Sequence, residues 1–308
     1  IEKQVGAIDG DGRGMTKKVL VLGGGGLLGR ALGRHVPAGW TADLPARSEL
    51  PLEDVDAILR RIERDAISRV ILTAAWTRVD DCEADPDRAF FVNGHLPGRL
   101  AAVLARIDVP LTFLSTDYVF DGSASRPYRE YDPPGPRGVY ARSKWYGECA
   151  VREAAGDYRI VRTSGLYGPG GPDFVSAVSA RLAQGTVSVV DDQIVAPTRV
   201  DDLAPAVWRI AGSCVRGTLH ATAQGETTWF GFARELARNL GLPESRVEPT
   251  TTASLGRPAP RPAYSILNGH RLRTELGVEL PTWQEGLRRH FEEERAKTPS
   301  GATPEDVS

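Results

Sequence analysis

The segment KKVLVLGGGGLLG, Lys17–Gly29, joins a short apolar run to a cluster of glycines and decides the fold class. Its first half is predicted to be a buried strand, and a helix is predicted from Leu27 to about His35. In the spacing Gly23-x-x-Gly26-x-x-Gly29, the first glycine allows a tight turn, the second lets a pyrophosphate approach the backbone, and the third lets the helix pack closely. The positive end of that helix favours the anion. A glycine cluster can also be a flexible loop, but the flanking strand and helix favour a dinucleotide-binding turn.

Apolar strands and amphipathic helices alternate along the chain as far as about Gly170. The alternation favours a parallel sheet, because each connection between parallel strands needs a crossover. We therefore predict an α/β protein with a Rossmann-type doubly wound parallel sheet and a smaller C-terminal substrate-binding lobe. The other predicted strands are Thr41–Ala46, Arg69–Ala74, Leu111–Ser115, Arg159–Ser164 and Thr218–Ala221; the other predicted helices are Leu52–Arg64, Pro86–Ile107, Val139–Ala155 (ended by Gly156), Phe174–Ala183, Trp229–Leu240 and Pro281–Glu294.

The predicted domain organisation has four parts. Met15 is the only methionine, so we expect it to be the natural start and residues 1–14 to be an added, disordered leader. Residues 15–170 are predicted to form the dinucleotide-binding domain. Residues 171–294 are predicted to be mainly the substrate-binding lobe, with residues from about 195 to 222 returning to the core. Residues 295–308 are expected to be a disordered tail.

The composition is that of an ordinary globular protein, with 41% hydrophobic and 25% charged residues in 308. A formal net charge of −2 and the lack of any basic run argue against nucleic acid as a partner. No apolar run approaches the roughly 20 residues that span a bilayer, which argues against a membrane protein. Cys82, Cys149 and Cys214 are scattered and odd in number, which favours reduced thiols in a cytoplasmic protein over disulfides or a metal cluster.

Lys144 is the only lysine between Lys18 and Lys297, in a chain with 33 arginines and 5 lysines. Tyr140 precedes it by one helical turn, so the two side chains share a face. A phenol titrates near ~10 and must fall toward ~7 to exchange protons well at neutral pH. An adjacent ammonium together with a charged nicotinamide can lower the pKa in that direction. The pair could be a surface tyrosine beside a solvated lysine, but the scarcity of lysine favours the proton chemistry of carbonyl reduction.

The segment STDYVFDG, Ser115–Gly122, follows a predicted buried strand at the edge where open α/β sheets place ligands. Thr116 can donate a hydrogen bond to a substrate oxygen, and Asp117 can accept from sugar hydroxyls. Asp121 and Gly122 are typical of a turn.

This segment, followed by PYREYDPPGPRGVYARSKWYGE, resembles the extended short-chain dehydrogenase/reductases, specifically the dTDP-4-dehydrorhamnose reductases. The resemblance covers nearly all of Lys17–His290. A related dehydratase would be expected to carry an acid, usually Glu, in place of Tyr118. Further matching stretches are AAWTRVDDCEADPDRAFFVN, VRTSGLYG, DDQIVAPT, GETTWFGFA and RPAPRPAYSILN.

The resemblance implies a role for each site residue. Tyr140 would be the proton donor, Lys144 would bind the nicotinamide ribose and tune Tyr140, and Thr116 would polarise the C4 carbonyl of the substrate. Trp229 is expected to belong to the core. The implied cofactor-binding residues are Gly23, Gly26, Leu27, Leu28, Gly29, Arg47, Ser48, Leu52, Ala74, Ala75, Trp76, Asn93, Leu114, Tyr140 and Lys144. The implied substrate-binding residues are Thr116, Asp117, Tyr118, Gly165, Gln193, Pro197, Thr198 and Arg261, of which the last four would contact the nucleotide part.

The chain departs from the family pattern at three places. Gly165 stands where the family commonly has a tryptophan over the sugar, which implies a larger pocket. Pro51-Leu52 replace an aspartate beside the adenine, while Arg47 could pair with a 2′-phosphate, favouring NADPH, with NADH as the alternative. Arg30 and Arg34 stand in the first helix, where they offer nothing comparable to the acidic magnesium ligands of some members, so we expect no metal.

The sequence therefore predicts an NAD(P)H-dependent reductase of the C4 ketone in a nucleotide-linked 4-keto-6-deoxyhexose, with dTDP as the expected nucleotide. A tailoring 4-ketoreductase of deoxysugar biosynthesis is favoured over rhamnose synthesis proper. The alternatives are a sugar-nucleotide epimerase or dehydratase and a non-catalytic NADP-binding regulatory subunit. A homodimer is one candidate assembly.

Overall fold

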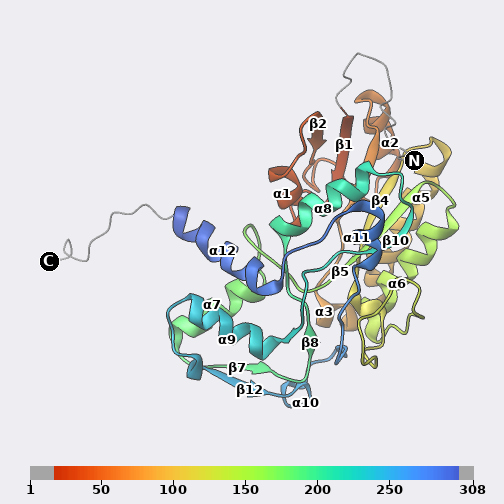
Figure 1. Ribbon diagram of the computed structural model, residues 1–308. Coiled ribbons are helices and arrows are strands. Elements are labelled where there is room, and N and C mark those ends of the chain that lie inside the picture. Colours follow the sequence, from red (N-terminus) through yellow and green to blue (C-terminus); the bar gives the residue numbers. More distant parts are fainter. Residues whose placement is uncertain (1–16, 298–308) are drawn as a thin grey trace, which may run out of the picture.

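The computed structural model describes residues 17–297, and its centre is a six-stranded parallel sheet (Figure 1). The predicted α/β class and doubly wound parallel sheet are confirmed. Strand order is β10-β5-β4-β3-β1-β2. The strands are β1 (Lys17–Leu22), β2 (Trp40–Asp43), β3 (Arg69–Leu72), β4 (Leu111–Thr116), β5 (Tyr158–Thr163) and β10 (Gly217–His220).

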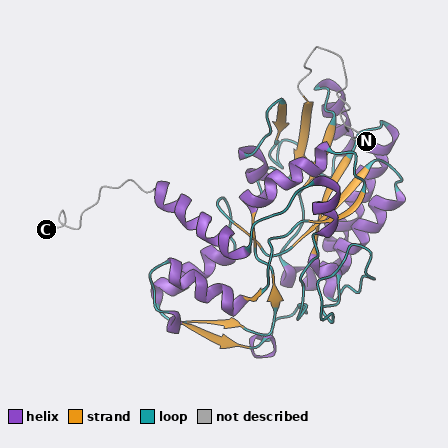
Figure 2. Cartoon of the chain, viewed as in Figure 1, coloured by secondary structure: helices purple, strands orange, loops and turns teal. Residues whose placement is uncertain are grey.

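The central strand β1 shows why both faces of the sheet are covered. Val19 and Val21 pack into one apolar cluster, and Leu20 and Leu22 pack into another on the opposite face, as the two-residue period of a strand requires. Each fully buried Val or Leu contributes roughly 1.5–3 kcal/mol relative to exposure. The first cluster includes α1 (Leu27–Arg34), α8 (Val200–Gly212) and α11 (His270–Leu276), and the second includes α2 (Val55–Arg64), α5 (Leu96–Arg106) and part of α6 (Gly138–Glu153) (Figure 2).

The order of the strands fixes where a ligand can bind. Strand β1 lies between β2 and β3, so the chain leaves β1 toward one edge of the sheet and later returns on its other side. The connections diverge at the carboxyl ends of these strands and leave a crevice there. Every candidate residue that follows β1, β3, β4 or β5 is thereby brought to one edge.

The C-terminal half also contains a group of elements apart from the main sheet, in the lower left of Figure 1. Helices α7, α9 and α12 share an apolar cluster with the strand pair β7 and β12. The predicted domain boundaries stay predictions. The bounds are β6 (Leu166–Tyr167), α7 (Phe174–Gln184), β7 (Val187–Val190), β8 (Ile194–Val195), β9 (Thr198–Arg199), β11 (Thr227–Thr228), α9 (Trp229–Asn239), β12 (Val247–Thr250), α10 (Thr252–Leu255) and α12 (Trp283–Lys297).

The predicted helix Pro86–Ile107 is wrong as a single element. It comprises α4 (Pro86–Phe90), a π-helical segment (Phe91–His95) and α5. Pro97 near the start of α5 has no N–H with which to continue a regular ladder. A Cβ added at Gly147 of α6 would lie 2.2 Å from the Asn93 carbonyl oxygen, so the wider turn lies in a close crossing of two helices. Single π turns of this kind are frequent at functional sites.

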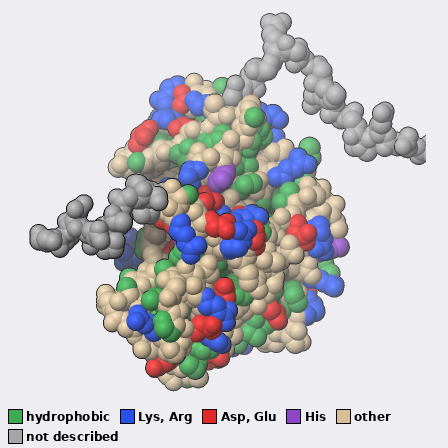
Figure 3. Space-filling model, turned by 60° about the vertical axis from the view of Figure 1, so that its left-hand side comes forward, with side chains coloured by type: hydrophobic (Ala, Val, Ile, Leu, Met, Phe, Trp, Pro, Cys, Tyr) green, Lys and Arg blue, Asp and Glu red, His purple; other side chains and the backbone are tan. Residues whose placement is uncertain are grey.

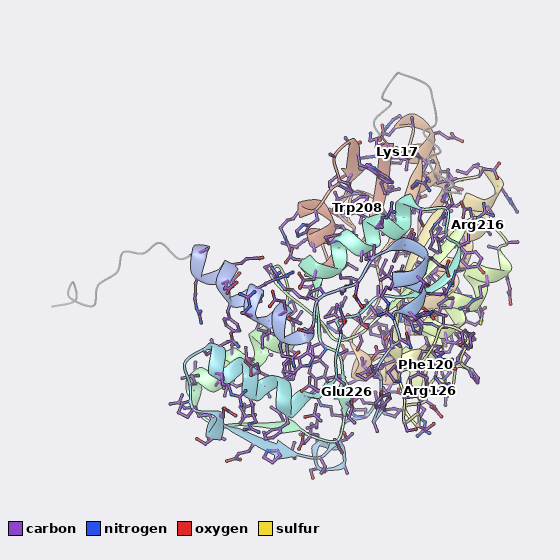
Figure 4. All side chains as sticks on the ribbon, in the orientation of Figure 1. Lys17, Phe120, Arg126, Trp208, Arg216 and Glu226 are labelled. Carbon is purple, nitrogen blue, oxygen red and sulfur yellow. The ribbon has the colours of Figure 1, made fainter. Side chains whose placement is uncertain are left out.

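Four helices of the described chain, α3 (Val79–Ala84), α8, α10 and α11, were not predicted, and several predicted boundaries shift. Helix α3 is short, and α8 contains Pro205, a residue that locally argues against a helix. Trp208 of α8, labelled in Figure 4, donates its indole N–H to the Leu32 carbonyl at 3.1 Å. Helix α6 ends at Glu153, and Ala155, rather than the predicted Gly156, has the positive φ of 54° that follows it.

The ends of the described chain and its surface complete the fold. Helix α12 runs through Lys297, beyond the predicted start of the tail at residue 295. The remaining tail and the predicted leader 1–14 lie outside the described residues. Within residues 17–297, every helix is too short or too polar to cross a bilayer. Acidic and basic side chains lie next to each other across the face in Figure 3, as expected for a surface of near-zero net charge.

Candidate active site

A cavity of about 690 Å³ opens at the carboxyl edge of the sheet. Its size is that of an ordinary small-molecule site. It runs from Arg47 beyond β2, across the glycine turn, to Trp229 at the start of α9. The predicted site residues that line it are Gly23, Gly26, Leu27, Leu28, Gly29, Arg47, Leu52, Ala74, Ala75, Trp76, Leu114, Thr116, Asp117, Tyr118, Tyr140, Lys144 and Gly165.

The glycine turn has the geometry expected for a pyrophosphate site. Gly23 has φ of 98°, and a Cβ there would lie 2.5 Å from the Ala74 nitrogen. A Cβ at Gly29 would lie 2.2 Å from the Gly23 carbonyl oxygen, so only glycine allows this close packing of turn and helix. Gly26 caps α1 without any side-chain hydrogen bond to the exposed N–H groups, and the first turn carries no acidic residue. The positive end of α1 is thus left to face an anion.

Two charged side chains, Asp43 and Arg47, lie at or after the end of β2, where the adenosine part of a dinucleotide would bind. Asp43, at the end of β2, accepts two hydrogen bonds from Arg61 at 2.8 and 2.9 Å. Both oxygens of its carboxylate are therefore occupied by hydrogen bonds within the protein. Arg47 lines the cavity, is largely exposed, and pairs with Glu53 at 2.7 Å. Ser48 does not line the cavity.

Asn93 supports the loop after β3 from beneath. Its side-chain oxygen accepts from the Trp76 N–H at 2.8 Å, and its amide donates to the Trp76 carbonyl at 3.0 Å and to Ser143 at 3.1 Å. Asn93 is fully buried and does not line the cavity. The residue predicted among the cofactor contacts therefore positions residues that line the cavity.

Helix α6 presents Tyr140 and Lys144 to the centre of the cavity, and both are buried. The Lys144 ammonium donates to the Leu114 carbonyl at 2.6 Å and lies 4.1 Å from the Phe113 ring centroid. Burial lowers the pKa of Lys144 to about 7, and the charge of Glu148 opposes that shift. The lysine can therefore gain or lose a proton near neutral pH.

The polypeptide by itself does not lower the pKa of Tyr140. Burial raises the pKa of Tyr140, and a hydrogen bond with Thr116 only partly opposes the effect. Its ring packs edge-on against Tyr118, with centroids 5.9 Å apart. Lys144 does not compensate, because its ammonium points to a backbone carbonyl. Tyr140 therefore keeps its proton at neutral pH in the polypeptide by itself.

Replacing Lys144 with Met is expected to stabilise the protein at pH 7 by about 2 kcal/mol, since a buried unpaired charge gives way to an apolar side chain of similar length. The folded pKa of about 7 lies below the ordinary 10.5, so the unfolded chain binds more protons between these values and the parent gains stability as pH rises. The advantage of Lys144→Met should therefore shrink toward pH 10.5. Urea unfolding across that range measures it, with exposed Lys17→Met as the control; a difference that is constant with pH would contradict the assignment.

Three polar side chains form a buried network beside Tyr140. The Thr116 hydroxyl donates to Asp117 at 3.0 Å and accepts from the Tyr118 N–H at 3.2 Å. Ser164 donates to the other oxygen of Asp117 at 2.9 Å. Burial raises the pKa of Asp117 to about 6. Asp117 thus orients the Thr116 hydroxyl, a role beyond the sugar contact expected from the sequence.

The sequence reasoning missed Thr163, which pairs with Thr116 across the parallel register of β4 and β5. It lines the cavity, is 6% exposed, and its hydroxyl has no hydrogen-bond partner among residues 17–297. A buried hydroxyl without a partner is costly, so the atom fits a site that accepts a polar ligand group. Its place at the carboxyl end of a buried strand was the available signal.

The residues Glu148 and Arg162 form a second network, behind the cavity, that was also missed. Glu148 accepts from Ser115 at 2.6 Å and from Arg162 at 2.7 and 2.9 Å. Arg152 adds a further bond at 2.7 Å. Glu148 follows Lys144 by one turn of α6, so the helix is joined to consecutive residues of β4, the carbonyl of Leu114 and the hydroxyl of Ser115.

The family model described as the RmlD substrate binding domain matches residues 17–296. This chain belongs to that family. It is 41% identical over 280 residues to dTDP-4-dehydrorhamnose reductase of Streptomyces griseus, covering 88% of this chain and 92% of that one. It is 40% identical over 279 residues to a probable dTDP-4,6-dihydroxy-2-methyloxan-3-one 4-ketoreductase of Streptomyces antibioticus, covering 88% and 94%. A crystal structure of dTDP-4-dehydrorhamnose reductase from Bacillus anthracis, in complex with NADP, matches with a TM-score of 0.86 and 32% identity, covering 91% and 100%.

The family assignment bears on the predicted activity. The predicted class, NAD(P)H-dependent oxidoreductase, is confirmed for the RmlD family to which the chain belongs. NADP in the Bacillus anthracis protein agrees with the predicted cofactor. Within residues 17–297, no group of three or more His, Cys, Asp or Glu side chains could hold a metal ion.

Four predicted substrate contacts of this RmlD-family chain lie outside the cavity wall. Gln193 donates to Thr252 at 2.8 Å, and Arg261 pairs with Asp80 at 2.7 Å. Thr198 is fully buried, donates to the Ala196 carbonyl at 3.0 Å and accepts from the Ala223 N–H at 3.0 Å. Pro197 packs against Gly165. The roles of Gln193, Pro197, Thr198 and Arg261 toward a nucleotide stay predictions.

Proposed function

We propose that this protein reduces the C4 ketone of a dTDP-linked 4-keto-6-deoxyhexose with NADPH, and that Tyr140 gives the proton. One observation carries the proposal: Tyr140, Lys144 and Thr116 meet the glycine turn in one cavity of a chain that belongs to the RmlD family. Relatives at 40 and 41% identity bear the names of a 4-ketoreductase and a dTDP-4-dehydrorhamnose reductase.

The chain offers a complete set of groups for the dinucleotide. Gly26 and the uncapped N-terminus of α1 would hold the pyrophosphate, and Arg47 a 2′-phosphate. Lys144 would hold the nicotinamide ribose, and Thr163 offers a buried hydroxyl without a protein partner. When bound, the reduced dinucleotide supplies the hydride for the sugar carbon.

Tyr140 supplies the proton that completes the reduction. As the ketone carbon accepts a hydride, its oxygen becomes an alkoxide that must take a proton from a nearby acid. A phenol whose pKa is raised by burial remains protonated until that negative charge develops beside it. Lys144, with a pKa of about 7, is able to take up or release a proton at neutral pH. Thr116, held by Asp117, is placed to polarise the carbonyl.

The proposal is tested by mixing the purified protein with NADPH and dTDP-4-keto-6-deoxyhexoses that differ at C2, C3 and C5. We expect one NADPH to be oxidised for each ketone consumed. An epimerase or dehydratase would change the sugar without net NADPH oxidation, and a regulatory subunit would bind NADPH without changing it. Because glycine stands at position 165 where the family commonly has tryptophan, the wall of the sugar end differs from the family pattern, and we favour a tailoring deoxysugar as the substrate over the precursor of rhamnose.

Replacing Arg47 with Ala is expected to raise KM for NADPH about tenfold and to leave KM for NADH within about twofold. A charge-assisted hydrogen bond contributes roughly 1.5–3 kcal/mol, and about 1.4 kcal/mol is a factor of ten. Steady-state kinetics with both cofactors measures the effect. Exposed Arg60, which does not line the cavity, provides the control variant Arg60→Ala. Equal changes for the two cofactors would contradict a 2′-phosphate contact.

A further inference from the structure

Gly165 and Trp229 are close neighbours in the wall of the cavity, although they are far apart in the sequence. Gly165 follows β5 with φ of 54°, in the left-handed region that favours glycine. A Cβ built on it would lie 3.3 Å from Cη2 of Trp229 and 3.1 Å from Cα of Pro197. The tip of the indole therefore occupies the space that a larger side chain at position 165 would need.

The indole of Trp229 is held in place from behind. It packs against Phe174 in a tilted arrangement, with ring centroids 4.4 Å apart and planes inclined at 31°, and it meets Phe232 edge-on at 6.2 Å. Thr228 caps the helix that begins with Trp229, and β11 pairs with β8, whose Val195 also lines the cavity. The residue expected to belong to the core thus contacts the core and also faces the cavity.

Trp229 lies at the end of the cavity away from the dinucleotide turn. It adjoins Gly165, two residues beyond the end of β5, whereas the glycine turn follows β1, three strands away in the sheet. At about 4.8 Å between strands, β5 and β1 are on the order of 14 Å apart. The walls near Trp229 are mostly apolar and are formed by Leu166, Pro172 and Val195.

We propose that Trp229 forms the wall against which the hexose ring of the substrate packs, and that Gly165 is required because it gives the indole its room. The inference rests on the proposed function and adds to it a residue that determines specificity for the sugar. The C–H groups on one face of a pyranose, and the methyl group of a 6-deoxy sugar, match the apolar face of an indole. The indole N–H is a hydrogen-bond donor that could reach a sugar hydroxyl.

The test compares binding of dTDP-L-rhamnose and dTDP by calorimetry, in the presence of NADP, for Trp229→Ala, Trp229→Phe and the parent. We expect Trp229→Ala to weaken dTDP-L-rhamnose about tenfold, a loss in the range of aromatic contacts, while dTDP binding changes less than about twofold. Trp229→Phe should retain most of the affinity. Phe230→Ala, a change at the next residue of α9 that does not line the cavity, should leave both affinities unchanged.

Gly165→Ala provides a second, independent route, because its methyl group must displace the indole tip or Pro197. Like Trp229→Ala, it should weaken the binding of dTDP-L-rhamnose, and it does so without removing a large side chain. Equal loss of dTDP and dTDP-L-rhamnose in the tryptophan variants, or no loss in either, would overturn the inference. Binding is measured without turnover. A parent that binds the sugar nucleotide but oxidises no NADPH would therefore refute the proposed reaction without refuting the role of Trp229 in sugar binding.

Discussion

Tyr140→Phe is expected to lower kcat by about 10³-fold, because the developing alkoxide loses its proton donor. The Kd for NADPH should change less than about threefold, since the ring and its edge-on contact with Tyr118 remain. Stopped-flow measurement of NADPH oxidation, together with a separate binding titration, distinguishes the two effects.

The matched control is Tyr146→Phe, on the exposed side of the same helix and away from the cavity. That variant should keep the parent's kcat. A Tyr140→Phe enzyme with undiminished kcat would show that another group, such as Asp117, supplies the proton.

Glu148→Ala is expected to reduce the free energy of unfolding by about 3–5 kcal/mol, because it leaves a buried guanidinium without its carboxylate. Arg162 is 1% exposed and Glu148 is fully buried, so water cannot replace the lost bonds. The side chains of Arg162, Arg152 and Ser115 all donate to Glu148. Urea unfolding measures the loss, and Glu153→Ala at the exposed end of α6 should remain within about 0.5 kcal/mol of the parent.

The loss of unfolding free energy in Glu148→Ala is expected to depend on pH. The arginines hold the pKa of Glu148 below its ordinary 4.5, despite burial. Its contribution to stability is therefore present above pH 4.5 and is lost as the pH falls through the lower folded pKa. The difference in the free energy of unfolding between Glu148→Ala and the parent should therefore become smaller at acid pH. A variant as stable as the parent at pH 7 would contradict the proposed role of the network.

The parts of the fold that could be predicted are those with a local signal. The glycine spacing at Gly23 and the alternating apolar strands predicted the parallel sheet, because turn geometry and period act over a few residues. Helix α8 packs in the core beside α1 and exposes only Pro205 and Arg209, and the proline inside it argued locally against a helix. The π-helical turn at Asn93 depends on the approach of Gly147 from another helix, which no local pattern reveals.

In the candidate site too, features with a local sequence signal could be predicted and features that depend on the tertiary fold could not. Tyr140 and Lys144 share a helical face, so their convergence followed from spacing alone. The raised Tyr140 pKa could not be predicted, because it depends on burial and on the Lys144 ammonium turning to the Leu114 carbonyl. The wall formed by Gly165 and Trp229 joins segments that only the tertiary fold brings together.

The central claim is that a hydride reaches the sugar C4 in this cavity while a proton reaches its oxygen. The most direct measurement uses NADPH deuterated on the transferred face at nicotinamide C4, a dTDP-4-keto-6-deoxyhexose and the purified protein, with NMR of the product. We predict one deuterium at sugar C4 for each NADPH oxidised and none at the neighbouring carbons. Sugar product that carries no deuterium at C4, or deuterated NADPH that remains unconsumed with every ketone in the panel, would contradict the account.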